Sequence, residues 1–250
     1  MYNDYALIKK STLTDIGDAI RAQKGTSGLI DPADFGSEIE SIEGGGLIIE
    51  GHAEVDSIIT DGNSYINTNI NPNPNYTIEM EFKISQIVEN NWDFLFGCKY
   101  GDKSGIAARF DIGESGTLAI KRSQTYLSNR EWGIVNFTKK DFSDYRVFKI
   151  AKNKAYIDDS LVYTFTATTE ANEQHYAYPL YLFTVNDSDT TYLNNSGYLD
   201  VKYVKLWDEK DNLILDLIPV VKNDGTVCMY NKVNGAYYYN AGAGTFTYTE

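Results

Sequence analysis

The chain has 250 residues and a formal net charge of −13, and its 20 tyrosines outnumber its 11 phenylalanines and 3 tryptophans. This acidic balance excludes proteins that bind nucleic acid or anionic membranes through a basic stripe, because phosphate recognition needs clustered Lys and Arg. The many aromatic residues favour strands and wet, amphipathic surfaces over helical cores.

We expect no export signal at the N-terminus. Met1-Tyr-Asn-Asp-Tyr5 lacks a charged segment followed by an apolar run, so we expect synthesis in the cytoplasm without a signal peptide. No apolar run approaches the ~18 residues of a membrane span, and we expect no membrane insertion. Cys98 and Cys228 are the two cysteines, and reduced core thiols are favoured over a disulfide.

Residues 1–46 have a helical pattern. Thr12 and Asp31 carry the side-chain oxygens typical of helix N-caps, and glycines at 44–46 end the second helix and form a hinge. Each helix has one apolar face, made of Leu13, Ile16 and Ile20 in the first and of Phe35, Ile39 and Ile42 in the second. Two helices of about a dozen residues cannot bury these faces alone. We therefore expect a module that anchors the protein or oligomerises it, with a helical cap on the chain's own β domain as the alternative.

Residues 47–250 have the pattern of a mainly β domain. The clearest strand is 76–84, in which Ile78, Met80, Phe82 and Ile84 alternate with polar residues. Other strands are expected at 55–60, 64–68, 92–98, 105–112, 117–122, 145–151, 155–157, 161–165 and 179–185. So many short strands predict an antiparallel sandwich of two sheets.

The last fifty residues predict an antiparallel meander. Short apolar and aromatic runs at 197–207, 212–220, 226–230, 236–240 and 244–248 are separated by turn dipeptides such as Asp224-Gly225 and Asn234-Gly235. These dipeptides tolerate positive φ and close tight hairpins.

This C-terminal stretch resembles a known family. The runs "KLWD", "LILDLIPV" and "VCMYNKVNGAYYYNAGAGTF", between Lys205 and Phe246, resemble the C-terminal half of laminin-G-like, concanavalin A-like jelly-roll domains. Such domains occur in tail-fibre and baseplate proteins of phages, prophages and phage-tail-like particles of Gram-positive bacteria. Residues 55–68 also resemble the opening hairpin of that family, and residues 11–42 resemble a helical module near the N-termini of such tail proteins.

The resemblance implies a fold, a setting and partners. The fold is a concanavalin A-like jelly roll at 47–250, preceded by the short helical module at 1–46. The setting is the virion tail or baseplate, where a homotrimeric receptor-binding protein would bind host-surface carbohydrate and contact other tail proteins. A purely structural packing module of the tail is the first alternative.

A surface-polysaccharide glycoside hydrolase is the second alternative. Concanavalin A-like hydrolases place three acidic residues at alternate positions of a strand, so that the carboxylates share one cleft. Glu79 and Glu81 occupy the first two positions here, but Lys83 occupies the third. No nucleophile elbow, phosphate loop or paired-cysteine motif is present either. The sequence therefore favours a protein that is not an enzyme.

Three loops mix aromatic rings with Asn, Asp and Arg, the combination that binds sugars. They contain the candidate carbohydrate-binding residues Trp92, Tyr126, Asn129, Arg130, Trp132 and Tyr192. Arg109 is expected near the first loop. A core residue at a strand end is the favoured interpretation for Trp92, whereas Trp132, which lies in a long polar connection, is the better candidate for an exposed aromatic platform.

A calcium site is also considered at the third of these loops, residues 186–195. Asp187, Asp189, Asn194 and Asn195 have the oxygen ligands that calcium takes, and laminin-G-like domains often carry calcium at a loop edge. An ordinary turn is the alternative, and no cofactor is required.

Overall fold

The computed structural model describes residues 51–72, 75–100, 104–123, 133–165, 178–188, 190–191 and 196–250. All of them belong to the second of two units into which the chain divides, residues 50–250. The helical module expected at 1–46, with its apolar residues from Leu13 to Ile42, lies outside the described residues. Its helices, its boundary and its role stay predictions.

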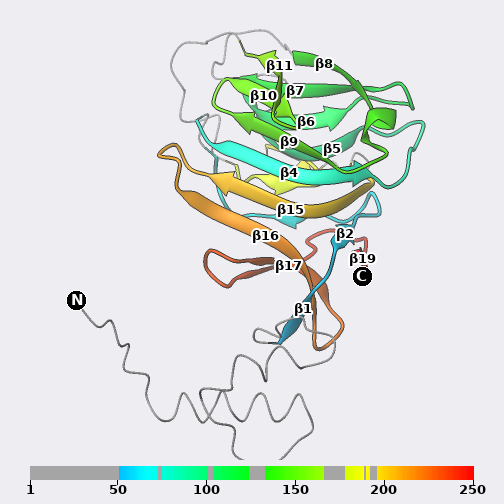
Figure 1. Cartoon of the computed structure of the whole chain (residues 1–250), viewed down its shortest axis with the longest axis vertical. Helices are drawn as coiled ribbons and strands as arrows, with labels where there is room; N and C mark the ends of the chain where they lie inside the picture. Colours follow the sequence, from blue (N-terminus) through cyan, green and yellow to red (C-terminus); the bar gives the residue numbers. More distant parts are fainter. Residues whose placement is uncertain are drawn as a thin grey trace, which may run out of the picture. The chain divides into compact units, whose positions relative to one another are not determined.

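The larger sheet, sheet A, runs through the domain as a ladder of antiparallel strands (Figure 1). Its order is β11-β10-β9-β4-β15-β16-β17-β18, and β1, β2 and β19 pair with its later strands. The strands are β1 (His52–Glu54), β2 (Ser57–Ile59), β4 (Thr77–Ile84), β9 (Arg146–Ala151), β10 (Lys154–Ile157), β11 (Ser160–Thr164), β15 (Leu199–Trp207), β16 (Leu213–Lys222), β17 (Val227–Asn231), β18 (Tyr237–Tyr238) and β19 (Thr247–Thr249).

The smaller sheet, sheet B, has the order β14-β13-β5-β6-β7-β8, and β12 joins β3 to β5. Its strands are β3 (Ile66–Asn67), β5 (Asp93–Tyr100), β6 (Ser104–Phe110), β7 (Thr117–Ser123), β8 (Gly133–Thr138), β12 (Tyr181–Leu182), β13 (Asn186–Asp187) and β14 (Thr190–Thr191). The pairing of β13 with β5 is parallel. The short 3-10 helix η2 (Lys139–Phe142) connects β8 of this sheet to β9 of sheet A.

One hydrophobic core lies between the sheets, because the inward residues of both sheets belong to a single cluster. Phe82 of sheet A stacks on Phe142 of η2 at 5.0 Å, and Phe142 meets Phe110 of sheet B edge-on at 5.1 Å. All three rings are fully buried, and burying one phenylalanine contributes about 1.5–3 kcal/mol. This arrangement is a two-sheet β-sandwich, as the strand pattern predicts, and it is consistent with the jelly roll that the resemblance implies.

The strand prediction holds for most strands, long and short, and misses four. The strand expected at 76–84 is β4, and the expected C-terminal meander is formed by β15 to β18, whereas β19 pairs with β2. The strand expected at 179–185 is limited to two residues, because Phe183 adopts a left-handed φ of 70° that ends β12. The sequence analysis did not predict β1, β8, β13 or β14.

Two further expectations concern buried groups and membranes. Both cysteines are free and buried, which confirms the prediction of core thiols. Within the described ranges, no helix is long and apolar enough to cross a membrane.

Candidate functional site

Trp92 lies at the entrance to sheet B, where the connection from β4 reaches β5. Its neighbour Asp93 is the first residue of β5 and is fully buried. Alternation then points Trp92 away from the interior. The indole is partly exposed and packs against a small hydrophobic cluster of Phe94, Ala107 and Val185 on the outer side of the sheet. Trp92 is therefore a residue of the outer surface and not of the main core.

The guanidinium of Arg109 covers the Trp92 ring. Arg109 pairs with Phe94 across β5 and β6, so its side chain rises on the outer side of sheet B. Its Cζ lies 4.4 Å from the centroid of the Trp92 ring and 5.6 Å from that of Phe94. Such cation–π contacts contribute about 0.5–2 kcal/mol, more when they are desolvated. The proximity of Arg109 to Trp92 confirms the sequence prediction.

Arg109 also binds a carboxylate. Its Nη2 lies 3.3 Å from Oδ1 of Asp111, whose side chain is 37% exposed, whereas that of Arg109 is 16% exposed. Trp92, Arg109 and Asp111 thus present an aromatic ring, a planar cation and an acceptor where β5 begins and β6 ends, at the ends of two central strands of sheet B. We call these three residues the Trp92 site.

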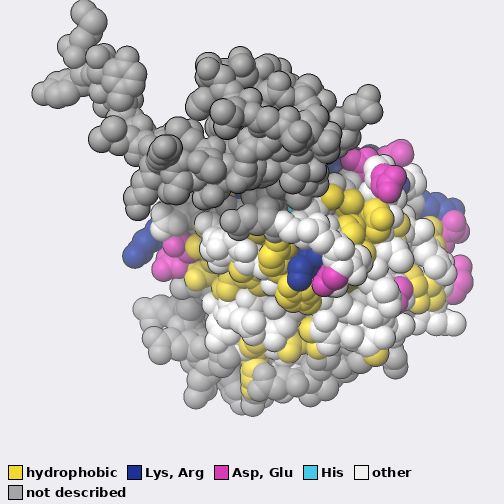
Figure 2. All heavy atoms as spheres, turned by 90° about the horizontal axis from the view of Figure 1, so that it is seen from below, with side chains coloured by type: hydrophobic (Ala, Val, Ile, Leu, Met, Phe, Trp, Pro, Cys, Tyr) yellow, Lys and Arg dark blue, Asp and Glu magenta, His cyan; other side chains and the backbone are white. Residues whose placement is uncertain are grey.

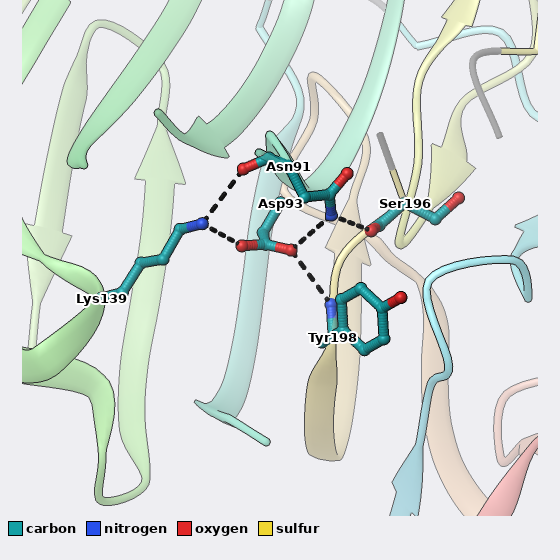
Figure 3. Close-up of polar contacts among 5 residues, drawn as sticks. All are labelled: Asn91, Asp93, Lys139, Ser196 and Tyr198. Carbon is teal, nitrogen blue, oxygen red and sulfur yellow. Dashed lines mark hydrogen bonds and ion pairs between the residues drawn. The ribbon is translucent and has the colours of Figure 1, made fainter. Parts of the chain in front are cut away.

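A buried polar network holds the backbone on both sides of Trp92 (Figure 3). The Asn91 side chain donates from Nδ2 to Oδ1 of Asp93 at 2.8 Å and to the carbonyl of Ser196 at 3.0 Å. The backbone N–H of Tyr198 donates to the same Asp93 oxygen at 3.3 Å. Asn91 is 7% exposed and Asp93 is 0% exposed. The residues before and after Trp92 are therefore fixed to the segment 196–198, which leads into β15.

Lys139 completes this network from the opposite side, as Figure 3 shows. Its ammonium group forms an ion pair with Asp93 and donates to the carbonyl of Asn91 at 3.1 Å. Both charged side chains are 0% exposed. Burial raises the pKa of the Asp93 carboxyl, while Lys139, Asn91 and the Tyr198 N–H oppose that rise. Because both ions lie out of water, loss of either one would leave the other unpaired.

The helix η2 explains how a lysine enters the interior. Thr138 donates its backbone N–H at 2.7 Å and its hydroxyl at 2.9 Å to Asp141. This bonding closes a tight turn that sends Phe142 into the core. Lys139 enters the interior from the same turn.

A second charged pair lies near the other end of β5. Asp187 of β13 pairs in register with Lys99, and their side chains form an ion pair with 8% and 12% exposure. Phe94 and Lys99 are five positions apart, which is about 15 Å along a strand. The Lys99–Asp187 pair is thus separate from the Trp92 site.

The calcium set is only partly described. Asp189, Asn194 and Asn195 lie outside the described residues, and the carboxylate of Asp187 is already paired with Lys99. No group of three His, Cys, Asp or Glu side chains is placed to hold a metal ion in the described part of the chain. The calcium site at Asp187, Asp189, Asn194 and Asn195 therefore stays a prediction.

One of the six expected sugar-binding residues, Trp92, lies among the described residues. The loop residues Tyr126, Asn129, Arg130, Trp132 and Tyr192 lie outside the described residues, and they stay predictions. The structure places one member of the set, Trp92, and brings Arg109 to it.

The carboxylates considered for hydrolysis lie on the outer face of sheet A. Glu79 is paired with a lysine of β9 at 3.0 Å, and Glu81 with a lysine of β15 at 3.3 Å. Lys83 pairs with Asp200 at 3.2 Å. Each charge of this row is thus matched by an opposite charge on a neighbouring strand, as in a solvent-facing strand.

The sequence analysis missed the Lys139–Asp93 pair and an aromatic cluster around His52. His52 is 3% exposed, and its ring lies 4.5 Å from that of Tyr230, at a tilt of 40°. The sequence did contain a signal for the aromatic cluster: Tyr237 and Tyr239 are two residues apart, a spacing that places both rings on one face of a strand. No signal in the sequence singled out Lys139 from Lys140.

The comparisons with known proteins bear on the fold. No protein-family model matches the chain, and no curated protein matches it. A solved structure of a protein from Bacteroides ovatus ATCC 8483 with a proposed carbohydrate-binding role matches with a TM-score of 0.50 and 9% identity. That match covers 79% of this chain and 61% of the Bacteroides protein, so this chain spans less than two thirds of its length.

A weaker match is the CBM40 of the Ruminococcus gnavus IT-sialidase, solved with α2,3-sialyllactose. It has a TM-score of 0.44 and 10% identity, and it covers 66% of this chain and 92% of that module. At these identities the Bacteroides match shows a shared fold, a β-sandwich, and nothing about the ligand.

Proposed function

We propose that the β domain binds carbohydrate and that the Trp92 site is part of its glycan-binding surface. The observation that carries the proposal is the Arg109 guanidinium 4.4 Å from the Trp92 ring, where β5 begins and β6 ends. Sugars stack their apolar C–H faces on aromatic rings, and Arg and Asp bind their hydroxyl groups. Trp92, Arg109 and Asp111 supply these groups from adjacent positions.

The rigidity of the site supports this proposal. A binding residue is more effective when its conformation is fixed before the ligand arrives, because less conformational entropy is lost on binding. Asn91 and Asp93 fix the backbone around Trp92. Asn91 donates to Asp93 and to the Ser196 carbonyl, and the Tyr198 N–H donates to Asp93. Lys139 donates to the Asn91 carbonyl and forms a buried ion pair with Asp93. The ring and its stacked cation are thus preorganised.

The fold and the surface also support it. The Bacteroides ovatus protein with the similar fold has itself a proposed carbohydrate-binding role. Figure 2 shows hydrophobic side chains reaching the surface of the described domain in patches, with single acidic and basic side chains among them. A mixed surface of this kind suits hydroxyl-rich ligands better than strongly charged ones.

The resemblance to tail proteins gives the proposed setting. The chain would be a tail-fibre or baseplate component of a phage, prophage or phage-tail-like particle, with a host-surface glycan as ligand. Residues 1–46 would attach it to other tail proteins or form a homotrimer. Three copies would raise the avidity of weak sugar contacts without any new contact. No catalytic step and no cofactor belong to this proposal.

The test is binding of the purified full chain to an array of bacterial surface glycans, with Trp92→Ala beside it. We expect wild-type binding and at least a tenfold loss in Trp92→Ala, which corresponds to about 1.4 kcal/mol. Trp207→Ala is the matched control, because Trp207 is a partly exposed tryptophan at the end of β15 in the other sheet.

Silence of the wild-type protein across the array would overturn the proposal. It would favour the alternative of a structural packing module, whose partners are other tail proteins. Equal losses in the two tryptophan variants would contradict the assignment to Trp92.

A further inference from the structure

A second aromatic group on sheet A is not used by the Trp92 site. It consists of His52, Lys222, Tyr230, Tyr237 and Tyr239, which we call the tyrosine cluster. Tyr230 of β17 pairs with Tyr237 of β18, and His52 of β1 pairs with Lys222 of β16. Side chains of four chain segments therefore meet on one face of the sheet.

The rings of the tyrosine cluster form a continuous series. His52 lies 4.5 Å from Tyr230, Tyr230 lies 5.3 Å from Tyr237, and Tyr237 lies 6.2 Å from Tyr239, all between ring centroids. The planes of Tyr237 and Tyr239 differ by 30°. Two rings of similar orientation thus follow one another along the chain.

The inner end of the series is fixed and the outer end is exposed. His52 is 3% exposed, and its Nδ1 is hydrogen-bonded to the hydroxyl of Tyr237 at 2.7 Å. Tyr239 is 46% exposed. A ring that leaves nearly half of its surface in water contributes less to core burial than it would in the interior. The Tyr239 ring is therefore presented to solvent on a rigid support.

Polar groups lie beside the exposed rings. The ammonium group of Lys222 lies 5.4 Å from the centroids of both Tyr237 and Tyr239, and it donates to the Tyr239 hydroxyl at 3.3 Å. Asp224 lies 3.9 Å from the same ammonium, so the two opposite charges offset each other locally. The cluster thus offers aromatic faces, a hydrogen-bond donor and phenolic oxygens with little net charge.

We infer that the tyrosine cluster is a second saccharide-binding site, specific for a neutral, extended oligosaccharide. This inference rests on the proposed carbohydrate-binding function and adds a ligand class and a second surface. Two rings in series suit two successive pyranose units, while Lys222 and the tyrosine hydroxyls bind the sugar hydroxyls. An anionic glycan fits less well, because Asp224 offsets Lys222 and the whole chain carries −13.

The test uses the full chain and four hexasaccharide probes. Cellohexaose, chitohexaose and maltohexaose are neutral, and a hexagalacturonate is anionic. Binding is followed by NMR of tyrosine rings labelled with carbon-13 and by calorimetric stoichiometry. We expect one neutral probe to shift the ring signals of Tyr237 and Tyr239, also in the Trp92→Ala variant.

Substitutions separate ligand contact from structure. Tyr239→Ala should weaken the binding of that probe at least tenfold, and Tyr239→Phe, which keeps the ring, should retain most of it. Tyr248→Ala is the matched control, since Tyr248 of β19 is 39% exposed and lies outside the cluster. Thermal unfolding checks that Tyr239→Ala stays folded.

The outcomes distinguish this inference from the proposed function. If the bound probes lose affinity in Trp92→Ala only, or if Tyr239→Ala leaves the affinity unchanged, the second site is overturned and the proposed function stands. Binding of hexagalacturonate alone overturns the neutral ligand class. A protein that binds none of the four probes and no array glycan contradicts both.

Discussion

Lys139 and Asp93 form an ion pair in which neither side chain has any exposure to solvent. The pair joins η2 to the first residue of β5, and through Asp93 it also holds the chain at Tyr198. It thus ties three segments that are distant in sequence at one end of the sandwich. Because buried ions are costly without partners, the pair should contribute more to the specificity of this end than to its net stability.

Lys139→Met should destabilise the β domain strongly. The substitution leaves the Asp93 carboxylate buried without its cation, and breaking a buried pair on one side costs about 3–5 kcal/mol. Urea unfolding of the full chain measures the loss. Lys140→Met is the matched control, because Lys140 pairs with Glu114 at the surface with 62% exposure, and it should change stability by no more than about 0.5 kcal/mol.

A double variant tests whether the loss comes from the unpaired charge. Asp93→Asn removes the carboxylate but keeps an oxygen for the Asn91 and Tyr198 donors. Combined with Lys139→Met, it should restore part of the stability. Equal unfolding midpoints for Lys139→Met and Lys140→Met would contradict the role of the pair.

Asp141 should make the stability of the domain depend on acid pH. The hydrogen bonds from Thr138 hold the pKa of the Asp141 carboxyl below its ordinary value, and they outweigh the small effect of burial. A carboxyl with a lowered folded-state pKa stabilises the fold above its unfolded pKa of about 3.9. That stabilisation is lost as the pH falls through the lowered folded-state pKa.

The measurement is thermal unfolding between pH 2 and pH 5. Asp141→Asn should unfold at a lower temperature than the wild type at pH 5, and the difference should shrink toward pH 2. Asp144→Asn, an exposed change of the same charge on the neighbouring turn, is the control. A constant difference across the pH range would show that Asp141 does not act through its ionisation.

Both thiols should be unreactive in the folded protein. Burial raises the pKa of Cys98 to about 12 and that of Cys228 to about 11. The thiolate is the reactive form, so both groups stay protonated at pH 8. Alkylation with iodoacetamide followed by mass spectrometry should label neither thiol in native buffer and both in 6 M urea. Rapid native labelling of Cys98 would contradict its position in the core between the sheets.

Sequence patterns predicted the long strands because each has one face in the core. β4 shows this directly: Ile78, Met80, Phe82 and Ile84 are buried and alternate with the half-exposed Glu79, Glu81 and Lys83. The two-residue strands β13 and β14 had no such signal, because a period of two cannot be recognised in so short a segment. Phe183 could not be predicted either, since its left-handed backbone is imposed by tertiary contacts.

The site was less predictable than the fold. Trp92 was singled out because it is an aromatic residue among Asn and Asp residues, and the structure shows it beside Arg109, while its role in binding stays a prediction. Lys139 was missed because sequence rules place lysine at the surface, and only the three-dimensional partner, Asp93, makes its burial favourable. The tyrosine cluster could not be predicted without knowing that β1 pairs with β16, because this pairing joins residues far apart in the chain.

The chain should not release reducing ends from bacterial surface polysaccharides. Glu79 and Glu81 are each paired with a separate lysine, Lys149 and Lys202, and Tyr203 also donates to Glu79 at 3.2 Å. Hydrolysis needs one carboxyl that gives up a proton and another that stays ionised. A reducing-sugar assay checks this expectation, with Glu81→Gln as the comparison. Release by the wild type that is lost in Glu81→Gln would establish the hydrolase alternative.

Arg109→Lys should weaken glycan binding more than it weakens the fold. Lysine keeps the positive charge near Asp111, but it has no planar group to stack on the Trp92 ring or to bind sugar hydroxyls in a fixed geometry. We expect a loss of about three- to tenfold in affinity for a glycan retained by the wild type, or about 0.7–1.4 kcal/mol.

Arg146→Lys is the matched control for that loss. Arg146 also lies over an aromatic ring, with its Cζ 5.8 Å from Phe137, and it pairs with Asp158 at 2.8 Å. It belongs to β9 of sheet A, away from the Trp92 site. If both variants bind like the wild type, the stacked guanidinium is structural, and the glycan contacts must come from Trp92 and its other neighbours. A loss confined to Arg109→Lys assigns the cation itself to recognition, since both variants keep the positive charge and both remove a guanidinium that lies over an aromatic ring.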